Sequence, residues 1–179
     1  MSLFPSVMGE AFERLSAPLQ RFHSLRGTQS LRGRVQTEAP STRAARWLAR
    51  CLGAPHQAMD GAIRFDLDAG PDLETWTRHF PQHHMRSQLS GAGAHLVEQL
   101  GVVRLRFLLL EQGGVLRMHL DGLQVLGVPC PRWLLPRVHA QETGRDGAVF
   151  FEVHAALPGL GTVSAYRGHL VLPVEGVSS

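Results

Sequence analysis

The chain has 179 residues, enough for one domain to bury an apolar core without disulfides or a structural metal. We therefore expect a single domain over residues 1–179, with an ordered core from about residue 3 to residue 172. The formal net charge is only +3, and all the basic residues are arginines scattered along the chain rather than clustered with aromatic residues. This distribution argues against nucleic acid as a partner.

The cysteines and the N-terminus indicate the compartment. Cys51 and Cys130 lie far apart and form no CxxC pair, which favours two reduced thiols. The N-terminus contains Glu10 and Glu13 and lacks the basic stretch and apolar run of a signal peptide. No apolar run approaches the roughly 18 residues of a membrane-spanning helix. We expect a cytoplasmic protein without a membrane span.

Helical segments are predicted near the N-terminus. From Ser6 to about Leu25, apolar residues recur every three or four positions, as on one face of a helix. Pro18 is expected to divide this segment into two short helices. Residues 26–33 are predicted to form a loop or the entry to a first strand, and residues 33–38 are predicted to be extended. A further helix is predicted to begin with Ser41 as its N-cap and to stop at Gly53.

From residue 62 onward the apolar period changes to two, which predicts strands. Runs over residues 62–68, 75–80 and 83–89 are followed by a hairpin over 102–127 and by runs over 137–143, 148–156 and 162–172. In the hairpin, a turn at Gly113-Gly114 sets the register. It places Phe107 opposite Leu120, Leu109 opposite Met118 and Leu105 opposite Gly122, and it predicts a cross-strand ion pair between Arg106 and Asp121.

This order of elements predicts an α+β fold. Strands joined mainly by hairpins form an antiparallel sheet, and a sheet of about seven or eight strands tends to curl into a half-barrel or barrel. The N-terminal helices are expected to pack on or across this strongly curved sheet. Such an architecture often encloses a ligand cavity.

Catalytic and metal-binding motifs are absent from the sequence. His79, His83 and His84 are the densest histidine group, but Pro81 interrupts them and adjacent strand residues point to opposite faces, so we expect no metal site. There is no GxSxG elbow, no phosphate-binding loop before a helix and no GxGxxG after a strand. No cofactor is expected.

Several polar residues share a strand face with apolar ones. Arg78 has the parity of Trp76 and Phe80. Ser87 likewise shares parity with Met85, and Tyr166 shares parity with Leu170. A buried guanidinium is costly unless it is paired. Arg78 therefore needs a carboxylate such as Glu142 or Glu152, or an anionic ligand, unless its stem lies along the aromatics with its head in solvent.

Five short motifs occur in a characteristic order: LQRFH (19–23), WTRHF (76–80), MRSQL (85–89), VPCPRWLLP (128–136) and YRGHL (166–170). Together they resemble the bacterial family catalogued as domain of unknown function 4166 (DUF4166), over residues 3–172. Val128-Pro129 departs mildly from the Leu-Pro of the family pattern. The resemblance implies no established activity. It does imply a link to dehydrogenase-like domains, to which some members are fused.

Three functions are compatible with these features. The leading hypothesis is a non-catalytic domain that binds a small apolar or amphipathic anionic molecule, with Phe107, Met118 and Phe151 adding to the apolar wall. Its ligand-binding residues would be Trp76, Arg78, Phe80, Met85, Ser87, Glu142 and Tyr166. One rival is a cofactor-independent isomerase or cyclase, whose acid and base would come from His23, His119, Glu142 and Tyr166. The other is an interaction or scaffold partner of a separately encoded dehydrogenase, with an exposed apolar patch around residues 133–135.

Overall fold

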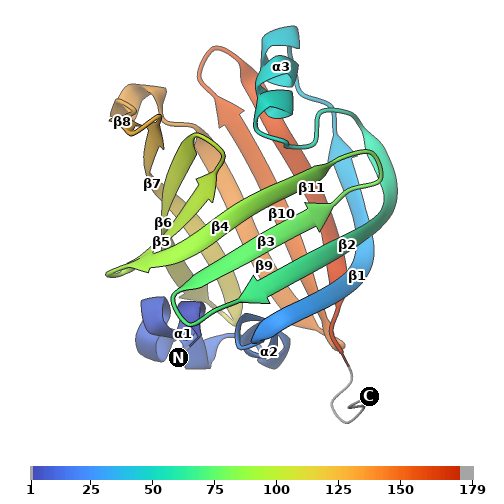
Figure 1. The fold of residues 1–179 in the computed structure, drawn as a ribbon, viewed down its shortest axis with the longest axis vertical. Helices are drawn as coiled ribbons and strands as arrows, with labels where there is room; N and C mark the ends of the chain where they lie inside the picture. The colour runs from blue at the N-terminus through green and yellow to red at the C-terminus, as the bar shows by residue number, and fades with distance from the viewer. Residues whose placement is uncertain (1, 174–179) are drawn as a thin grey trace.

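Strands dominate the computed structural model, which describes residues 2–173 (Figure 1). The helical elements are α1 (Leu3–Met8), the 3-10 helix η1 (Gly9–Arg14), α2 (Ala17–His23), α3 (Arg43–Cys51) and the 3-10 helix η2 (Arg132–Leu134). The strands are β1 (Gly27–Glu38), β2 (Met59–Ala69), β3 (Leu73–His79), β4 (His84–Ala92), β5 (His95–Leu100), β6 (Val103–Gln112), β7 (Val115–Val125), β8 (Val128–Pro129), β9 (Arg137–Arg145), β10 (Ala148–Leu157) and β11 (Gly161–Val171).

The sheet closes into an antiparallel barrel. Its strand order is β6-β5-β4-β3-β2-β1-β11-β10-β9-β7, and pairing of β6 with β7 completes the ring of ten, while β8 extends from β7. The predicted curved antiparallel sheet is confirmed as a full barrel. The predicted count of about seven or eight strands is too low, in part because β5 has no clear alternation of apolar and polar residues.

The register of the β6–β7 hairpin is confirmed close to its turn. Phe107 pairs with Leu120 and Leu109 pairs with Met118, as the Gly113-Gly114 turn predicted. A β-bulge between Arg106 and Phe107 then shifts the register, so Leu105 faces Leu123 rather than Gly122. The predicted ion pair survives this shift, because Arg106 Nη2 lies 2.8 Å from Asp121 Oδ2.

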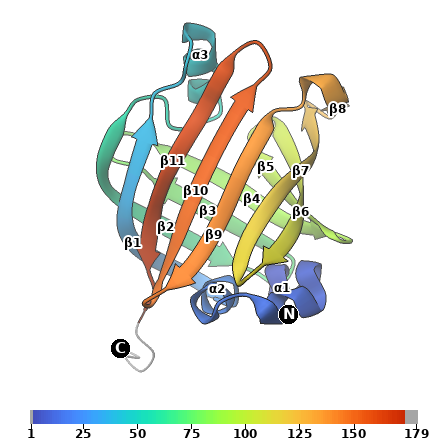
Figure 2. The ribbon, with the colours of Figure 1, turned by 180° about the vertical axis from the view of Figure 1, so that it is seen from behind.

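Helices lie at the two ends of the barrel (Figures 1 and 2). Helices α1 and α2, with η1 between them, lie across one end, here called the closed end, and Pro18 stands in the first turn of α2, where proline is tolerated. Helix α3 lies at the other end, here called the mouth. Its N-cap is Thr42, whose Oγ1 accepts from the Ala45 N–H at 3.1 Å. The expected cap, Ser41, instead accepts from the Thr162 N–H at 3.0 Å.

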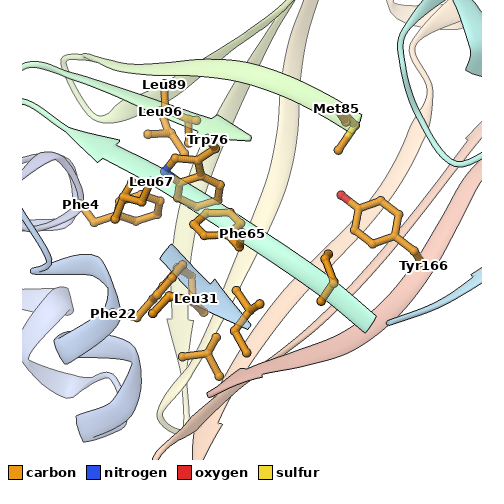
Figure 3. Close-up of a cluster of buried hydrophobic side chains, with 14 of the residues drawn as sticks. Phe4, Phe22, Leu31, Phe65, Leu67, Trp76, Met85, Leu89, Leu96 and Tyr166 are labelled. Carbon is orange, nitrogen blue, oxygen red and sulfur yellow. The ribbon is translucent and has the colours of Figure 1, made fainter. Parts of the chain in front are cut away.

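An aromatic cluster fills the barrel at the closed end (Figure 3). Phe4 of α1 is fully buried, and its ring centroid lies 5.9 Å from that of Trp76. Phe22 of α2 lies 5.6 Å from Phe65, which in turn lies 5.2 Å from Trp76. Four residues of the apolar stripe that predicted the N-terminal helices are buried: Phe12, Leu15, Leu19 and Phe22.

Gly168, in the last motif of the sequence, allows close packing of β11. A Cβ at this position would collide with the carbonyl oxygen of Arg34 on β1 and would lie 2.8 Å from the Phe151 ring. The absence of a side chain leaves room for Phe151 between two inward-facing residues, Tyr166 and Leu170. The spacing of Tyr166, Gly168 and Leu170 in this motif thus reflects strand alternation, because all three residues belong to the inner face of β11.

Candidate functional site

The barrel encloses an apolar cavity of about 400 Å³. This volume falls within the roughly 300–1,000 Å³ of sites that bind small molecules. Apolar side chains from most of the barrel strands form its wall, among them Phe65, Met85, Leu89, Leu96, Phe107, Met118, Val149, Phe151 and Val153. The inward-facing side chains of the barrel strands therefore do not fill the barrel completely.

The cavity runs from the closed end to the mouth. Phe22 and Trp76 bound it at the closed end, where the aromatic cluster lies. At the mouth it is lined by Leu48 of α3, by Cys130 and by Leu134 of η2. Two segments distant in sequence thus meet the same opening.

Arg78 places a guanidinium against this apolar wall. Its Nη1 donates to Ser87 Oγ at 3.1 Å, and its Nη2 lies 3.6 Å from Glu98 Oε1. The guanidinium carbon also lies 5.1 Å from the centroid of the Trp76 ring. Arg78 therefore has a carboxylate partner, but this is Glu98 of β5 rather than either residue that the sequence suggested.

The two carboxylates named from the sequence have other partners. Glu142 Oε2 lies 2.7 Å from His23 Nε2, and both side chains are buried at the closed end. The His23 ring also stacks on Phe4 at a centroid distance of 3.7 Å. Glu152 is exposed on the outer face and accepts a hydrogen bond from the Gln141 amide at 2.9 Å. The Glu142–His23 contact therefore ties β9 to α2.

Tyr166 and Ser164 present two hydroxyl groups on the inner face of β11, and both residues line the cavity. Figure 3 shows the Tyr166 ring directed into the barrel, with its oxygen toward the interior. Burial raises the pKa of the Tyr166 hydroxyl, while the positive charge of Arg78 acts in the opposite direction. The Ser164 Oγ is buried and has no hydrogen-bond partner among the described residues. Sequence reasoning missed Ser164, although it shares strand parity with Tyr166.

Glu74 is a buried carboxyl group beside the aromatic cluster. Its Oε2 accepts from the Trp76 Nε1–H at 2.9 Å, and the backbone N–H of Leu3 also donates to this carboxyl. Burial raises the pKa of Glu74, and the hydrogen bond from Trp76 opposes the shift. Glu74 was not identified from the sequence, although its parity with Trp76 marks it as inward-facing.

The structure brings most of the predicted site residues together. Five of the seven line the cavity: Trp76, Arg78, Met85, Glu142 and Tyr166. Ser87 is buried beside them and reaches the site through its hydrogen bond with Arg78. Phe80 lies next to the wall, with its ring centroid 5.5 Å from that of Tyr166.

The candidate acids and bases do not form one cluster around Arg78. His119 is exposed on the outer face of β7. His23 and Glu142 contact each other, and no hydrogen bond joins either of them to Arg78 within residues 2–173. Tyr166 remains as the single candidate whose hydroxyl lies in the charged field of Arg78 and Glu98.

His79 and His83 make different contacts. His79 Nε2 lies 2.7 Å from Asp66 Oδ2 on the outer surface. His83 stacks on Phe80 at a centroid distance of 4.8 Å, and burial lowers its pKa. Over the part of the chain that the structure describes, no group of three or more His, Cys, Asp or Glu side chains could hold a metal ion.

Comparisons with known proteins give a family and a similar structure. A family model described as "Domain of unknown function (DUF4166)" matches residues 15–170. No curated protein matches the chain. Among solved structures, the chain is similar to the one described as "Crystal Structure of Rv2717c from M. tuberculosis", with 13% identity and a TM-score of 0.48. That match covers 89% of this chain and 99% of the other.

Proposed function

The chain belongs to the family described as domain of unknown function DUF4166, as its motifs predicted, and from its cavity we propose that the barrel binds a small apolar or amphipathic anionic molecule. The ligand's apolar part would lie against the barrel wall and its polar end would reach Arg78. This binding requires no cofactor and no chemical step.

The observation that carries this proposal is the composition of the cavity. A space of about 400 Å³ lies inside a closed barrel whose wall is mainly Leu, Val, Phe and Met. Water in such a space has few hydrogen-bond partners, so an apolar ligand gains free energy by replacing it. A few polar groups then suffice to orient the ligand.

Arg78 supports an anionic or strongly polar ligand end. A guanidinium has five N–H donors, more than its contacts with Ser87 and Glu98 use. The contact with Glu98 is long for a charge-assisted hydrogen bond, at 3.6 Å. The hydroxyls of Tyr166 and Ser164 line the same cavity and can supply further hydrogen bonds.

Binding is favoured over the isomerase or cyclase alternative by the arrangement of the titratable groups. An isomerase or cyclase would be favoured by two such groups within hydrogen-bond reach of Arg78 in the cavity. His119 lies outside the barrel, and His23 is engaged with Glu142. Because the pKa of the Tyr166 hydroxyl is raised, this group keeps its proton. It is therefore suited to donating a hydrogen bond rather than to acting as a base.

Calorimetric titration with decanoate and with decanol tests the proposal. Both should bind the wild-type protein, and native mass spectrometry should show one added molecule per chain. Arg78→Met should weaken decanoate binding by about ten- to a hundredfold, the range for a hydrogen bond to a charged group, and leave decanol binding nearly unchanged.

A matched pair of variants on β10 checks the location. Val153 lines the cavity, whereas His154, the next residue, is exposed on the outer face. Val153→Trp should fill the space and abolish binding, and His154→Trp should preserve it. If neither compound binds, and protein purified without detergent carries no extra mass, a ligand-binding role is excluded for molecules of this class.

A further inference from the structure

The mouth of the barrel carries exposed apolar side chains from three separate connections. Trp47 of α3 is 68% exposed, Leu126 and Val128 after β7 are 75% and 67% exposed, and Trp133 of η2 is 74% exposed. Val102, between β5 and β6, is 55% exposed. These five residues are called the mouth rim. Exposed apolar residues gathered at one place indicate an interaction surface.

The connections at the mouth carry positive charge only, although Glu38, the last residue of β1, is exposed beside them. The connections at this end cover residues 39–58, 80–83, 101–102, 126–136 and 158–160, and none contains an Asp or Glu. They contain four arginines, all exposed: Arg43, Arg46, Arg50 and Arg132. Within residues 2–173 none of these four forms an ion pair, in contrast to Arg78 or Arg106.

The opposite end of the barrel has mixed charge. Exposed acids there include Glu10, Glu13, Asp72 and Asp146. The arginines at the mouth are therefore not a consequence of the slightly basic composition alone. The molecule has one end that combines exposed aromatic and aliphatic residues with unpaired positive charge.

We propose that the mouth rim docks on the surface of an anionic lipid bilayer. Tryptophan is enriched at membrane–water interfaces, where its ring lies at the level of the lipid headgroups. Arginines near an anionic leaflet add electrostatic attraction, and this combination is typical of proteins that lie on a membrane without spanning it. No helix among the described residues is long and apolar enough to cross a bilayer.

Docking in this orientation would bring the cavity mouth to the bilayer. Leu48 follows Trp47 on α3 and Leu134 follows Trp133 on η2, and both leucines line the cavity. Each segment therefore presents an exposed tryptophan next to a leucine that borders the same opening, and Leu134 is itself 37% exposed. An apolar molecule could pass between bilayer and barrel without crossing water. The docking surface itself stands whether or not the cavity holds such a molecule.

Sedimentation with sucrose-loaded vesicles tests the docking surface. Vesicles of three parts phosphatidylcholine to one part phosphatidylglycerol should bind the protein, and pure phosphatidylcholine vesicles should bind it far less. Raising the salt concentration should weaken binding, because the Debye length falls from about 10 Å at 0.1 M to about 3 Å at 1 M. Arg46→Ser with Arg132→Ser should lower binding about twenty-five-fold, at about fivefold per arginine.

The natural tryptophans report the orientation. The chain has three tryptophans, of which Trp76 is buried and the other two belong to the mouth rim. Brominated phosphatidylcholine in the anionic vesicles should quench the fluorescence of Trp47 and Trp133 but not that of Trp76. A Trp47→Ser, Trp133→Ser double variant should bind vesicles at least about tenfold less and lose the quenching.

A charge-matched control uses two exposed arginines of the barrel wall. Arg32 on β1 and Arg117 on β7 lie outside the mouth connections. Replacing both by serine should reduce vesicle binding much less than replacing Arg46 and Arg132. Equal losses from the two pairs would overturn docking through the mouth. Equal binding to neutral and anionic vesicles would also overturn it. So would a protein that binds no vesicles and instead forms a dimer on size-exclusion chromatography, if Trp133→Ser dissociates that dimer.

Discussion

Replacing Arg78 and Glu98 singly and together measures how far each depends on the other. Arg78 Nη2 and Glu98 Oε1 are 3.6 Å apart, and both side chains are largely buried. Two unit charges at this distance attract by about 5 kcal/mol at an effective dielectric constant of about 20. Desolvation of both groups offsets much of this attraction.

Each single variant leaves one charge facing an apolar cavity. Arg78→Met and Glu98→Gln should therefore each lower the free energy of unfolding by about 2–4 kcal/mol. The double variant removes both charges of this pair, so its loss should be smaller than the combined single losses by about 1–3 kcal/mol. Urea unfolding followed by circular dichroism gives all three values.

An exposed ion pair on the same barrel provides the control. Arg34 Nη2 lies 2.9 Å from Asp60 Oδ1, with side chains 69% and 49% exposed. The cycle Arg34→Met and Asp60→Asn should give a coupling below about 1 kcal/mol. If the Arg78–Glu98 coupling energy is also below about 1 kcal/mol, the contact with Glu98 does not stabilise Arg78. The ion pair described for this site is then refuted.

Three further substitutions and one control variant test the closed end and the strand packing. Phe4→Ala should cost about 3–5 kcal/mol in urea unfolding, because it empties a fully buried site; a loss below about 1 kcal/mol would show that α1 does not seal the barrel. Burial raises the pKa of Glu74, so the folded state binds this proton more tightly and stability falls as pH rises through that raised pKa. Glu74→Gln keeps an acceptor for the Trp76 N–H, so its melting temperature should equal that of the wild type at pH 4 and exceed it at pH 8. An equal difference in melting temperature at both pH values would contradict this. Gly168→Ala should lower the free energy of unfolding by more than about 3 kcal/mol, because the added Cβ overpacks the site. At Gly91 a Cβ comes no closer than 3.3 Å to its neighbours. Gly91→Ala should therefore be nearly neutral in thermal unfolding.

Much of the local structure could be predicted because it depends on neighbouring residues. The Gly113-Gly114 turn set the pairing of Phe107 with Leu120. Strand parity placed Trp76, Arg78 and Tyr166 on the inner face. The helix cap was misplaced by one residue, since Ser41 and Thr42 are both good caps and only the contact of Ser41 with β11 separates them.

Polar partners could not be predicted, because they depend on which strands become neighbours. Glu98 contacts Arg78 only because β5 pairs with β4, which pairs with β3. His23 contacts Glu142 although more than one hundred positions separate them, since α2 lies across the closed end next to β9. Neither contact has a signature in the spacing of residues.

The sequence by itself determined which residues face inward on most strands and how the β6–β7 hairpin begins, because strand alternation and glycine turns act over a few residues. Tertiary structure alone decided that ten strands close through β6 and β7. Closure depends on strand number, stagger and bulges summed around the whole sheet. It also decided that Arg78 meets both a carboxylate and a cavity, two alternatives that the sequence left open.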